Sequence, residues 1–93
     1  MRILFTSRAW NDYVSWQAGD RKTLRRINAL IADIARGAGK ENGGGGEGIG
    51  KPEALRHDLA GFWSRRIDQE HRLVYRVRDG AIEIVACRYH YDA

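Results

Sequence analysis

The apolar residues of this chain repeat with two different periods, and that change limits the folds available to it. Between residues 21 and 36 they recur every three or four positions, the spacing of one helix face. The members of this stripe are Leu24, Ile27, Leu30, Ile31 and Ile34. The last third of the chain instead predicts strands at residues 62–69, 71–78 and 81–89, and Asp79-Gly80 between the last two is a hairpin signal.

The N-terminal third completes the expected order of elements. A first strand is predicted at residues 2–6, followed by a helix at residues 8–18 with Ser7 as its N-cap. Gly19 ends that helix, and Asp20 can cap the next one. Two helices between a first strand and a later meander predict an α+β fold, a small, largely antiparallel sheet with both helices packed on one face. A length of 93 residues fits a single domain spanning residues 1–93.

A glycine-rich stretch, residues 37–50, separates the helices from the later strands. It holds eight of the 11 glycines, so a mobile loop is expected there. Gly45 to Lys51 matches the opening of a phosphate-binding P-loop, but Pro52 occupies the position that needs Ser or Thr to hold magnesium. A helix, not a strand, precedes the glycines as well. The P-loop interpretation is therefore rejected, and no cofactor is expected.

The net charge is basic but moderate, +4 from 16 basic and 12 acidic residues, which favours a polyanionic partner. Thirteen of the 16 cations are Arg, whose planar guanidinium suits phosphate, although a GC-rich genome would give the same bias. The single cysteine, Cys87, is expected to be a small buried apolar residue in a reducing compartment. Because no apolar run is long enough to span a bilayer, a cytoplasmic protein without membrane contact is expected.

The end of the chain gathers the side chains with the clearest chemistry. Arg88-Tyr89-His90-Tyr91 brings a guanidinium, an imidazole and two phenols together, and His90 can donate or accept a proton near neutral pH. Upstream, Glu53, Arg66 and Arg72 supply a base and cationic clamps. This set suits cleavage of a phosphodiester without a metal. The alternative, for the tail taken alone, is a frayed polar C-terminus.

The register of the last hairpin decides whether these groups can meet. A two-residue turn at Asp79-Gly80 would place Arg72 on the sheet face opposite His90. A three-residue loop from Arg78 to Gly80 would instead place Arg72, Arg88 and His90 on one face. Gly80 permits either turn, and the site requires the second one or a bend before His90.

On the preceding predicted strand, only one of two adjacent arginines can join the site, because neighbours on a strand point to opposite faces. Trp63 and Arg65 share a half-buried face, so Arg66 is the candidate. Surface salt bridging is the alternative for each of these arginines. His57 and His71 are expected to be hydrogen-bonded structural histidines, with His57 a lesser candidate for RNA contact. The spacing of the histidines and the cysteine predicts no metal site.

Motifs along the whole chain resemble one bacterial family. Residues 48–53 read Gly-Ile-Gly-Lys-Pro-Glu, residues 61–67 Gly-Phe-Trp-Ser-Arg-Arg-Ile, residues 70–75 Glu-His-Arg-Leu-Val-Tyr, and residues 86–91 Ala-Cys-Arg-Tyr-His-Tyr. Together they resemble the YoeB (Txe) toxins of the RelE-like superfamily. The resemblance implies a microbial-ribonuclease-like fold and a toxin that binds the 70S ribosome, cleaves mRNA in the A site and so inhibits translation. It also implies a homodimer and neutralisation by a YefM-type antitoxin.

Carried over by motif, the resemblance implies roles for single residues. Glu53 is implied as the general base, Arg72 as a phosphate-stabilising cation, and His90 as the general acid with Tyr91 beside it. Auxiliary RNA contacts are expected at Arg56, Arg66, His57 and Arg88. In this scheme the base activates the 2′-hydroxyl of RNA and the acid protonates the leaving 5′-oxygen, so DNA should not be cut.

Two departures from the family pattern are visible. Residues 37–46 of the glycine-rich stretch replace and lengthen a short Pro-Phe-Glu-Gly-type connection, which bears on how firmly Glu53 is positioned. Asp92-Ala93 extends a chain that in relatives commonly stops at His-Tyr. An alternative function is therefore a catalytically impaired protein that only binds RNA, the ribosome or the antitoxin.

Overall fold

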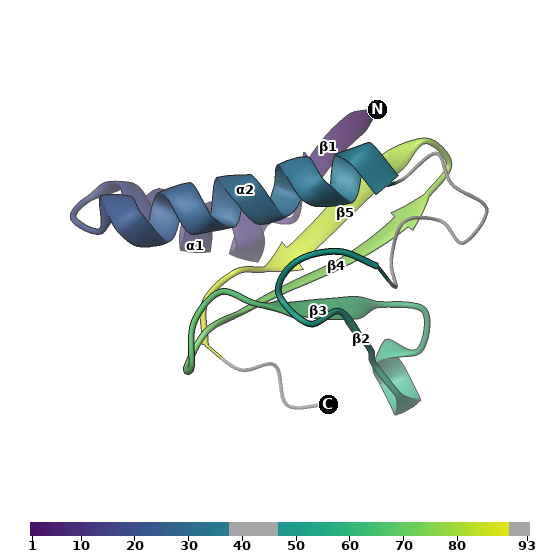
Figure 1. Cartoon of the computed structure of the whole chain (residues 1–93). Helices are drawn as coiled ribbons and strands as arrows, with labels where there is room; N and C mark the ends of the chain where they lie inside the picture. Colours follow the sequence, from purple (N-terminus) through teal and green to yellow (C-terminus); the bar gives the residue numbers. More distant parts are fainter. Residues whose placement is uncertain (38–46, 90–93) are drawn as a thin grey trace.

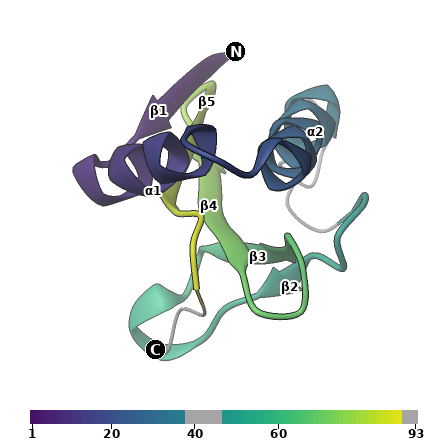
Figure 2. The same cartoon turned by 90° about the vertical axis from the view of Figure 1, so that its left-hand side faces the viewer.

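The computed structural model describes residues 1–37 and 47–89. Its elements are, in chain order, β1 (Arg2–Phe5), α1 (Ser7–Gln17), α2 (Arg21–Gly37), β2 (Glu53–Ala54), the 3₁₀ turn η1 (His57–Leu59), β3 (Trp63–Arg66), β4 (Arg72–Arg78) and β5 (Ala81–Ala86). One five-stranded sheet has the order β1-β5-β4-β3-β2, with β1 parallel to β5 and the other pairs antiparallel. Both helices lie on one face of this sheet (Figure 1, Figure 2). The predicted α+β fold is confirmed, with β2 as an additional strand.

The two helices begin at capping side chains. Thr6 caps α1, because its hydroxyl accepts a hydrogen bond from the Ala9 N–H at 3.1 Å. The prediction of Ser7 as the cap is wrong by one residue, since Ser7 is already helical. Asp20 caps α2 as predicted, and its carboxylate accepts from the Thr23 N–H at 3.0 Å.

The hydrophobic core lies between the helices and the sheet. The predicted stripe of α2 contributes the buried Ile27, Leu30, Ile31 and Ile34. The sheet contributes Leu73, Tyr75, Ile82 and Ile84, all fully buried. Burial of one such side chain stabilises the fold by about 1.5–3 kcal/mol relative to exposure. Both helices of the described part of the chain cover the same face of the sheet.

The turn of the β4–β5 hairpin contains two residues. Asp79 and Gly80 have φ angles of 52° and 71°, the left-handed pair that a type I′ turn needs. Arg78 and Ala81 therefore pair directly. Of the two turns that the sequence allowed, the three-residue loop is therefore not formed.

A β-bulge further along the same hairpin restores the register that the longer loop would have given. Tyr75 pairs with Ile84, but Val74 pairs with Ala86, which leaves Val85 as an extra residue on β5. Beyond the bulge, even-numbered residues of β5 face even-numbered residues of β4. The common face predicted for Arg72 and Arg88 is nevertheless not formed, because β5 ends at Ala86 and the Arg88 side chain contacts α1.

Other boundaries differ from the predictions. Glu53 and Ala54, which lie outside the predicted strands, pair with Ser64 and Trp63 as an edge strand. The strands predicted at residues 62–69 and 81–89 are shorter. The glycine-rich stretch falls largely on residues 38–46, outside the described residues. Within the described part of the chain, no helix combines the length and the apolar character needed to cross a membrane.

Candidate functional site

The sheet face away from the helices carries three of the predicted catalytic and RNA-binding groups. Arg66 pairs directly with Arg72, so both side chains leave the same face. Glu53 pairs with Ser64, two residues before Arg66 on β3, and alternation puts Glu53 on that face as well. Leu73, next to Arg72, points to the other face and is fully buried in the core. The structure therefore brings Glu53, Arg66 and Arg72 together on one open face.

The two arginines of this face differ in how they are held. Arg72 is half-buried, and its Nη1 donates to the carbonyl oxygens of Asp68 at 2.8 Å and His71 at 3.1 Å. Arg66 is exposed, and its guanidinium makes no hydrogen bond or ion pair to residues 1–37 or 47–89. Like charges directly opposite one another on a sheet are destabilising. An anion placed between them would relieve that repulsion.

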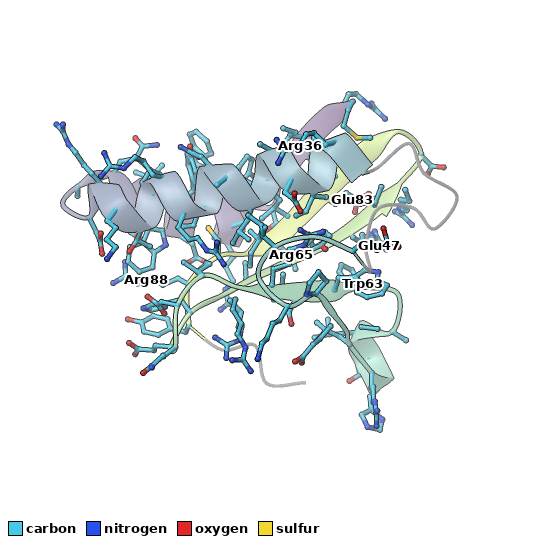
Figure 3. The ribbon with its side chains drawn as sticks, in the orientation of Figure 1. Arg36, Glu47, Trp63, Arg65, Glu83 and Arg88 are labelled. Atoms are coloured by element: carbon cyan, nitrogen blue, oxygen red, sulfur yellow. The ribbon has the colours of Figure 1, made fainter. Side chains whose placement is uncertain are left out.

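Arg65 lies on the opposite face of β3 and fixes the chain that leads into β2. Its side chain is fully buried, and its Nη1 donates to Asp33 Oδ2 on α2 at 2.6 Å. Its Nη2 donates to the Glu47 carbonyl oxygen at 2.8 Å, and its Nε to the Tyr75 hydroxyl at 2.8 Å. Figure 3 shows Arg65 between α2 and β3. Sequence alternation placed Arg65 on a half-buried face, but did not reveal this role.

We call Arg65, Asp33 and the segment Glu47–Gly50 the loop anchor. Ile49 is held on both sides, because its N–H donates to Asp33 Oδ2 at 3.2 Å and its carbonyl accepts from Arg65 Nη1 at 3.2 Å. The Gly50 carbonyl accepts from the Arg66 N–H at 2.7 Å. The hydrogen bond from Arg65 holds the pKa of Asp33 below its usual value. The anchor therefore fixes the last four residues of the glycine-rich stretch, shortly before Glu53.

The C-terminal segment Cys87–Tyr89 is bound to α1. The Cys87 carbonyl accepts from Trp16 Nε1 at 2.8 Å, and its N–H donates to Asp12 Oδ2 at 3.1 Å. The Cys87 side chain is fully buried, as predicted. Arg88 lies over the Trp16 ring at 4.5 Å and donates to Ser15 Oγ at 2.7 Å, so it contacts α1 and not the group around Arg72.

His90 and Tyr91 lie outside the described residues. The residue before them, Tyr89, donates its N–H to His71 Nδ1 at 2.7 Å, which confirms His71 as a hydrogen-bonded structural histidine. The Tyr89 carbonyl accepts from the Arg72 N–H at 3.1 Å. Tyr89 has a φ of 64°, so the chain leaves its extended course there. This is the bend before His90 that the sequence analysis named as the alternative to a longer loop.

The remaining cations near the open face are exposed or paired. Arg56 and His57 are exposed around η1, and within the described ranges the imidazole of His57 makes no hydrogen bond. Arg76 and Arg78 form surface salt bridges with Glu83 at 2.7 and 3.1 Å. Hydrogen bonding by Arg76 lowers the pKa of Glu83. The described residues hold no cluster of three potential metal ligands.

Comparison with known proteins places the chain in a family. Residues 5–91 match the family described as YoeB-like toxin of bacterial type II toxin-antitoxin system. The chain belongs to this family of toxins. Toxin YoeB of Streptomyces coelicolor is 57% identical over 98% of this chain and 100% of its own length. Toxin YoeB of Escherichia coli strain K12 is 48% identical over the same shares.

Solved structures give the same assignment for this YoeB-family toxin. A heterotetrameric YoeB-YefM toxin-antitoxin complex from Staphylococcus aureus matches with a TM-score of 0.85, 46% identity and 98% coverage of both chains. A YoeB dimer from the same species matches with the same TM-score and identity. The YafQ protein of Escherichia coli has a TM-score of 0.72 at 13% identity, which shows a shared fold alone. The resemblance noted from the sequence motifs is confirmed.

Proposed function

We propose that this YoeB-family toxin is a ribosome-dependent endoribonuclease that cleaves mRNA in the ribosomal A site by general acid–base catalysis. The observation that carries the proposal is the placement of Glu53, Arg66 and Arg72 on the one sheet face that no helix covers. A carboxylate beside two guanidinium groups suits a phosphodiester, because the base and the charge-stabilising groups are adjacent.

In this mechanism the nucleophile belongs to the RNA. Glu53 takes the proton of a 2′-hydroxyl, whose oxygen then attacks the adjacent phosphorus. Arg72 and Arg66 stabilise the additional negative charge on the phosphoryl oxygens. His90, with Tyr91 beside it, donates a proton to the departing 5′-oxygen. The products are a 2′,3′-cyclic phosphate and a 5′-hydroxyl end, and no metal ion takes part in the step.

The dependence on the ribosome has a physical rationale. One general acid or base contributes roughly 10²–10⁴-fold to a rate, which is modest for the cleavage of a flexible strand. Alignment of the 2′-hydroxyl with the leaving oxygen supplies a further large factor, and a codon held in the A site is aligned before the toxin acts. The exposed Arg56 and His57 near β2, and Arg88 beside α1, are the proposed outer RNA contacts.

The proposal includes protein partners. By analogy with the YoeB-YefM complex and the YoeB dimer of Staphylococcus aureus, we expect a homodimer and a YefM-type antitoxin. The structure offers an apolar groove of about 480 Å³ between β1, α1 and α2, where Trp10 is 52% exposed. The residues that line it are Ile3, Phe5, Trp10, Tyr13, Asn28, Ile31, Ala32 and Ala35. Such a surface suits the apolar side chains of a protein partner. The toxin would act in the cytoplasm, where ribosomes translate.

The test uses ribosomes programmed with a defined mRNA. Wild type is expected to cut the A-site codon, and His90→Gln to cut roughly 10²–10⁴-fold more slowly. An mRNA with a 2′-deoxy sugar at the cleaved position should resist cutting, because the nucleophile is missing. Equal, background-level cutting by wild type and His90→Gln would refute the enzyme and favour an impaired binding protein. Efficient cutting of naked RNA would refute ribosome dependence.

A charge-matched pair of variants tests the open face itself. Arg66 and Arg78 lie on the same face, but Arg78 is paired with Glu83 at 3.1 Å. Arg66→Gln is expected to slow cleavage at least tenfold, whereas Arg78→Gln, which removes the same charge, should have less than about a twofold effect. Equal losses in the two variants would indicate a general charge effect and contradict the site.

A further inference from the structure

The backbone immediately before the proposed acid is strained. Tyr89 has a φ of 64°, a left-handed conformation that few residues other than glycine adopt. Such a conformation persists only where the surroundings impose it. Tyr89 is 54% exposed, and its ring meets the His71 ring at a centroid distance of 5.2 Å.

The two polar groups of the Tyr89 backbone bind His71, which directly precedes β4, and Arg72, the first residue of β4. Its N–H donates to His71 Nδ1 at 2.7 Å, and its carbonyl accepts from the Arg72 N–H at 3.1 Å. A backbone N–H is always the donor, so His71 Nδ1 carries no proton here. The proton of the neutral ring is then on Nε2, which lies 3.5 Å from Glu70 Oε2.

The His71 ring is itself firmly placed. The residue is only 7% exposed, and the ring meets the Trp16 ring edge-on at a centroid distance of 4.8 Å. The His71 N–H donates to Asp68 Oδ1 at 2.7 Å. The Asp68 carbonyl also binds Arg72 Nη1, so one short turn holds both the Arg72 guanidinium and the ring that binds Tyr89.

We propose that His71 is a positioning residue for cleavage. Its Nδ1 holds Tyr89 in the left-handed conformation and so sets the direction in which the chain enters His90, relative to Arg72. This role rests on the proposed function, in which His90 protonates the leaving oxygen. A displacement of about 1 Å at a reacting group can cost roughly 10²-fold in rate, so the direction of one backbone unit is sufficient to matter.

Two substitutions separate this role from simple packing. In His71→Asn the side-chain oxygen takes the place of Nδ1 and can accept the Tyr89 N–H. In His71→Gln the oxygen takes the place of Nε2 and cannot. Both variants lose the same ring contacts with Trp16 and Tyr89, so their losses of thermal stability should be similar. The difference between the two variants therefore reports on the position of the acceptor.

The expected result on programmed ribosomes is a kcat at least tenfold lower for His71→Gln than for His71→Asn, with KM the same within about twofold. Amide hydrogen exchange by NMR should show the Tyr89 N–H protected in wild type and His71→Asn, and exposed in His71→Gln. Equal kcat values for the two variants, or an unprotected Tyr89 N–H in wild type, would overturn the proposal. If wild type and His90→Gln both fail to cut, the proposed function fails. The exchange measurement still decides whether His71 Nδ1 binds the Tyr89 N–H.

Discussion

The loop anchor predicts a large stability loss when Asp33 becomes neutral. Asp33→Asn keeps the shape of the side chain but removes the carboxylate charge that pairs with Arg65 Nη1 at 2.6 Å. Arg65 would then remain fully buried, with its positive charge facing the Tyr75 hydroxyl and two backbone carbonyl oxygens. A buried charge without its counter-charge is far more costly than a broken surface pair.

The magnitude follows from the burial of the two partners. Removal of one partner of a buried ion pair costs about 3–5 kcal/mol. The side chain of Asp33 is 18% exposed while that of Arg65 is 0% exposed, so water screens the pair in part. We therefore expect a loss of about 2–3 kcal/mol in the free energy of unfolding. For a domain of this size that corresponds to a fall in Tm of roughly 10–20 °C.

Urea unfolding followed by tryptophan fluorescence measures the loss directly, and an unchanged slope would show that the unfolded state is the same. The matched control is Arg36→Gln, because Arg36 also pairs with Asp33, at 3.2 Å, but its side chain is 70% exposed on the outer surface of α2 (Figure 3). This exposed pair should contribute less than about 0.5 kcal/mol. Similar small losses for Asp33→Asn and Arg36→Gln would refute the reasoning.

The pH dependence gives an independent check with a definite sign. The hydrogen bond from Arg65 lowers the pKa of Asp33 from the usual 3.8, so the folded state binds a proton less readily than the unfolded state. The contribution of Asp33 to stability is fully present above pH 3.8 and is lost as the pH falls through the lower folded-state pKa. The difference in stability between wild type and Asp33→Asn should therefore shrink below that pH. A difference that stays constant into strong acid would contradict the ion pair.

Three further predictions concern the frame of the site. Gly50→Ala should lower stability by about 1–3 kcal/mol in urea unfolding, because φ is +84° and a Cβ would lie 2.8 Å from Leu30 Cδ2; an unchanged midpoint would contradict the close packing. Thr6→Ala should cost about 1 kcal/mol and Ser7→Ala almost nothing, measured in the same way, since only Thr6 caps α1; the reverse order would contradict the cap. Burial raises the pKa of the Cys87 thiol to about 12, so iodoacetamide should label the protein at pH 8 only after denaturant is added, as followed by mass spectrometry; rapid labelling of the folded protein would contradict burial.

The elements that could be predicted from the sequence are those with a local signal. The stripe from Leu24 to Ile34 has helical spacing and no strand alternative, and Asp20 stands at the start of that helix. Asp79-Gly80 supplies the two left-handed residues of a tight hairpin turn. Each of these signals lies within a few residues of what it determines, which is why the order of elements was predictable.

The features that position the candidate site depend on distant partners and were not predictable in this way. A two-residue strand at Glu53 exists only because β3 pairs with it. No sequence signal marks Val85 as the extra residue of a bulge, yet it changes which sheet face the following residues of β5 point to. Arg65 could be assigned to a half-buried face by alternation, but its counter-charge Asp33 lies 32 residues earlier in the chain. The reactive groups were therefore easier to identify from the sequence than the strand pairing and buried contacts that position them.

The contacts that hold the site and the groups proposed to do the chemistry lie on opposite sides of the sheet. Arg65 and its anchor fix the approach to Glu53 from the helix side, where burial makes hydrogen bonds strong. On the open face, the positive charges of Arg66 and Arg72 lie directly opposite one another, an arrangement that weakens the fold and suits an anionic ligand. The buried contacts on the helix side thus stabilise the sheet beneath the site. The exposed groups on the open face need not take part in stabilising contacts and can face the substrate. The lengthened glycine-rich connection is then tolerable, because the anchor fixes the chain after those glycines and before Glu53.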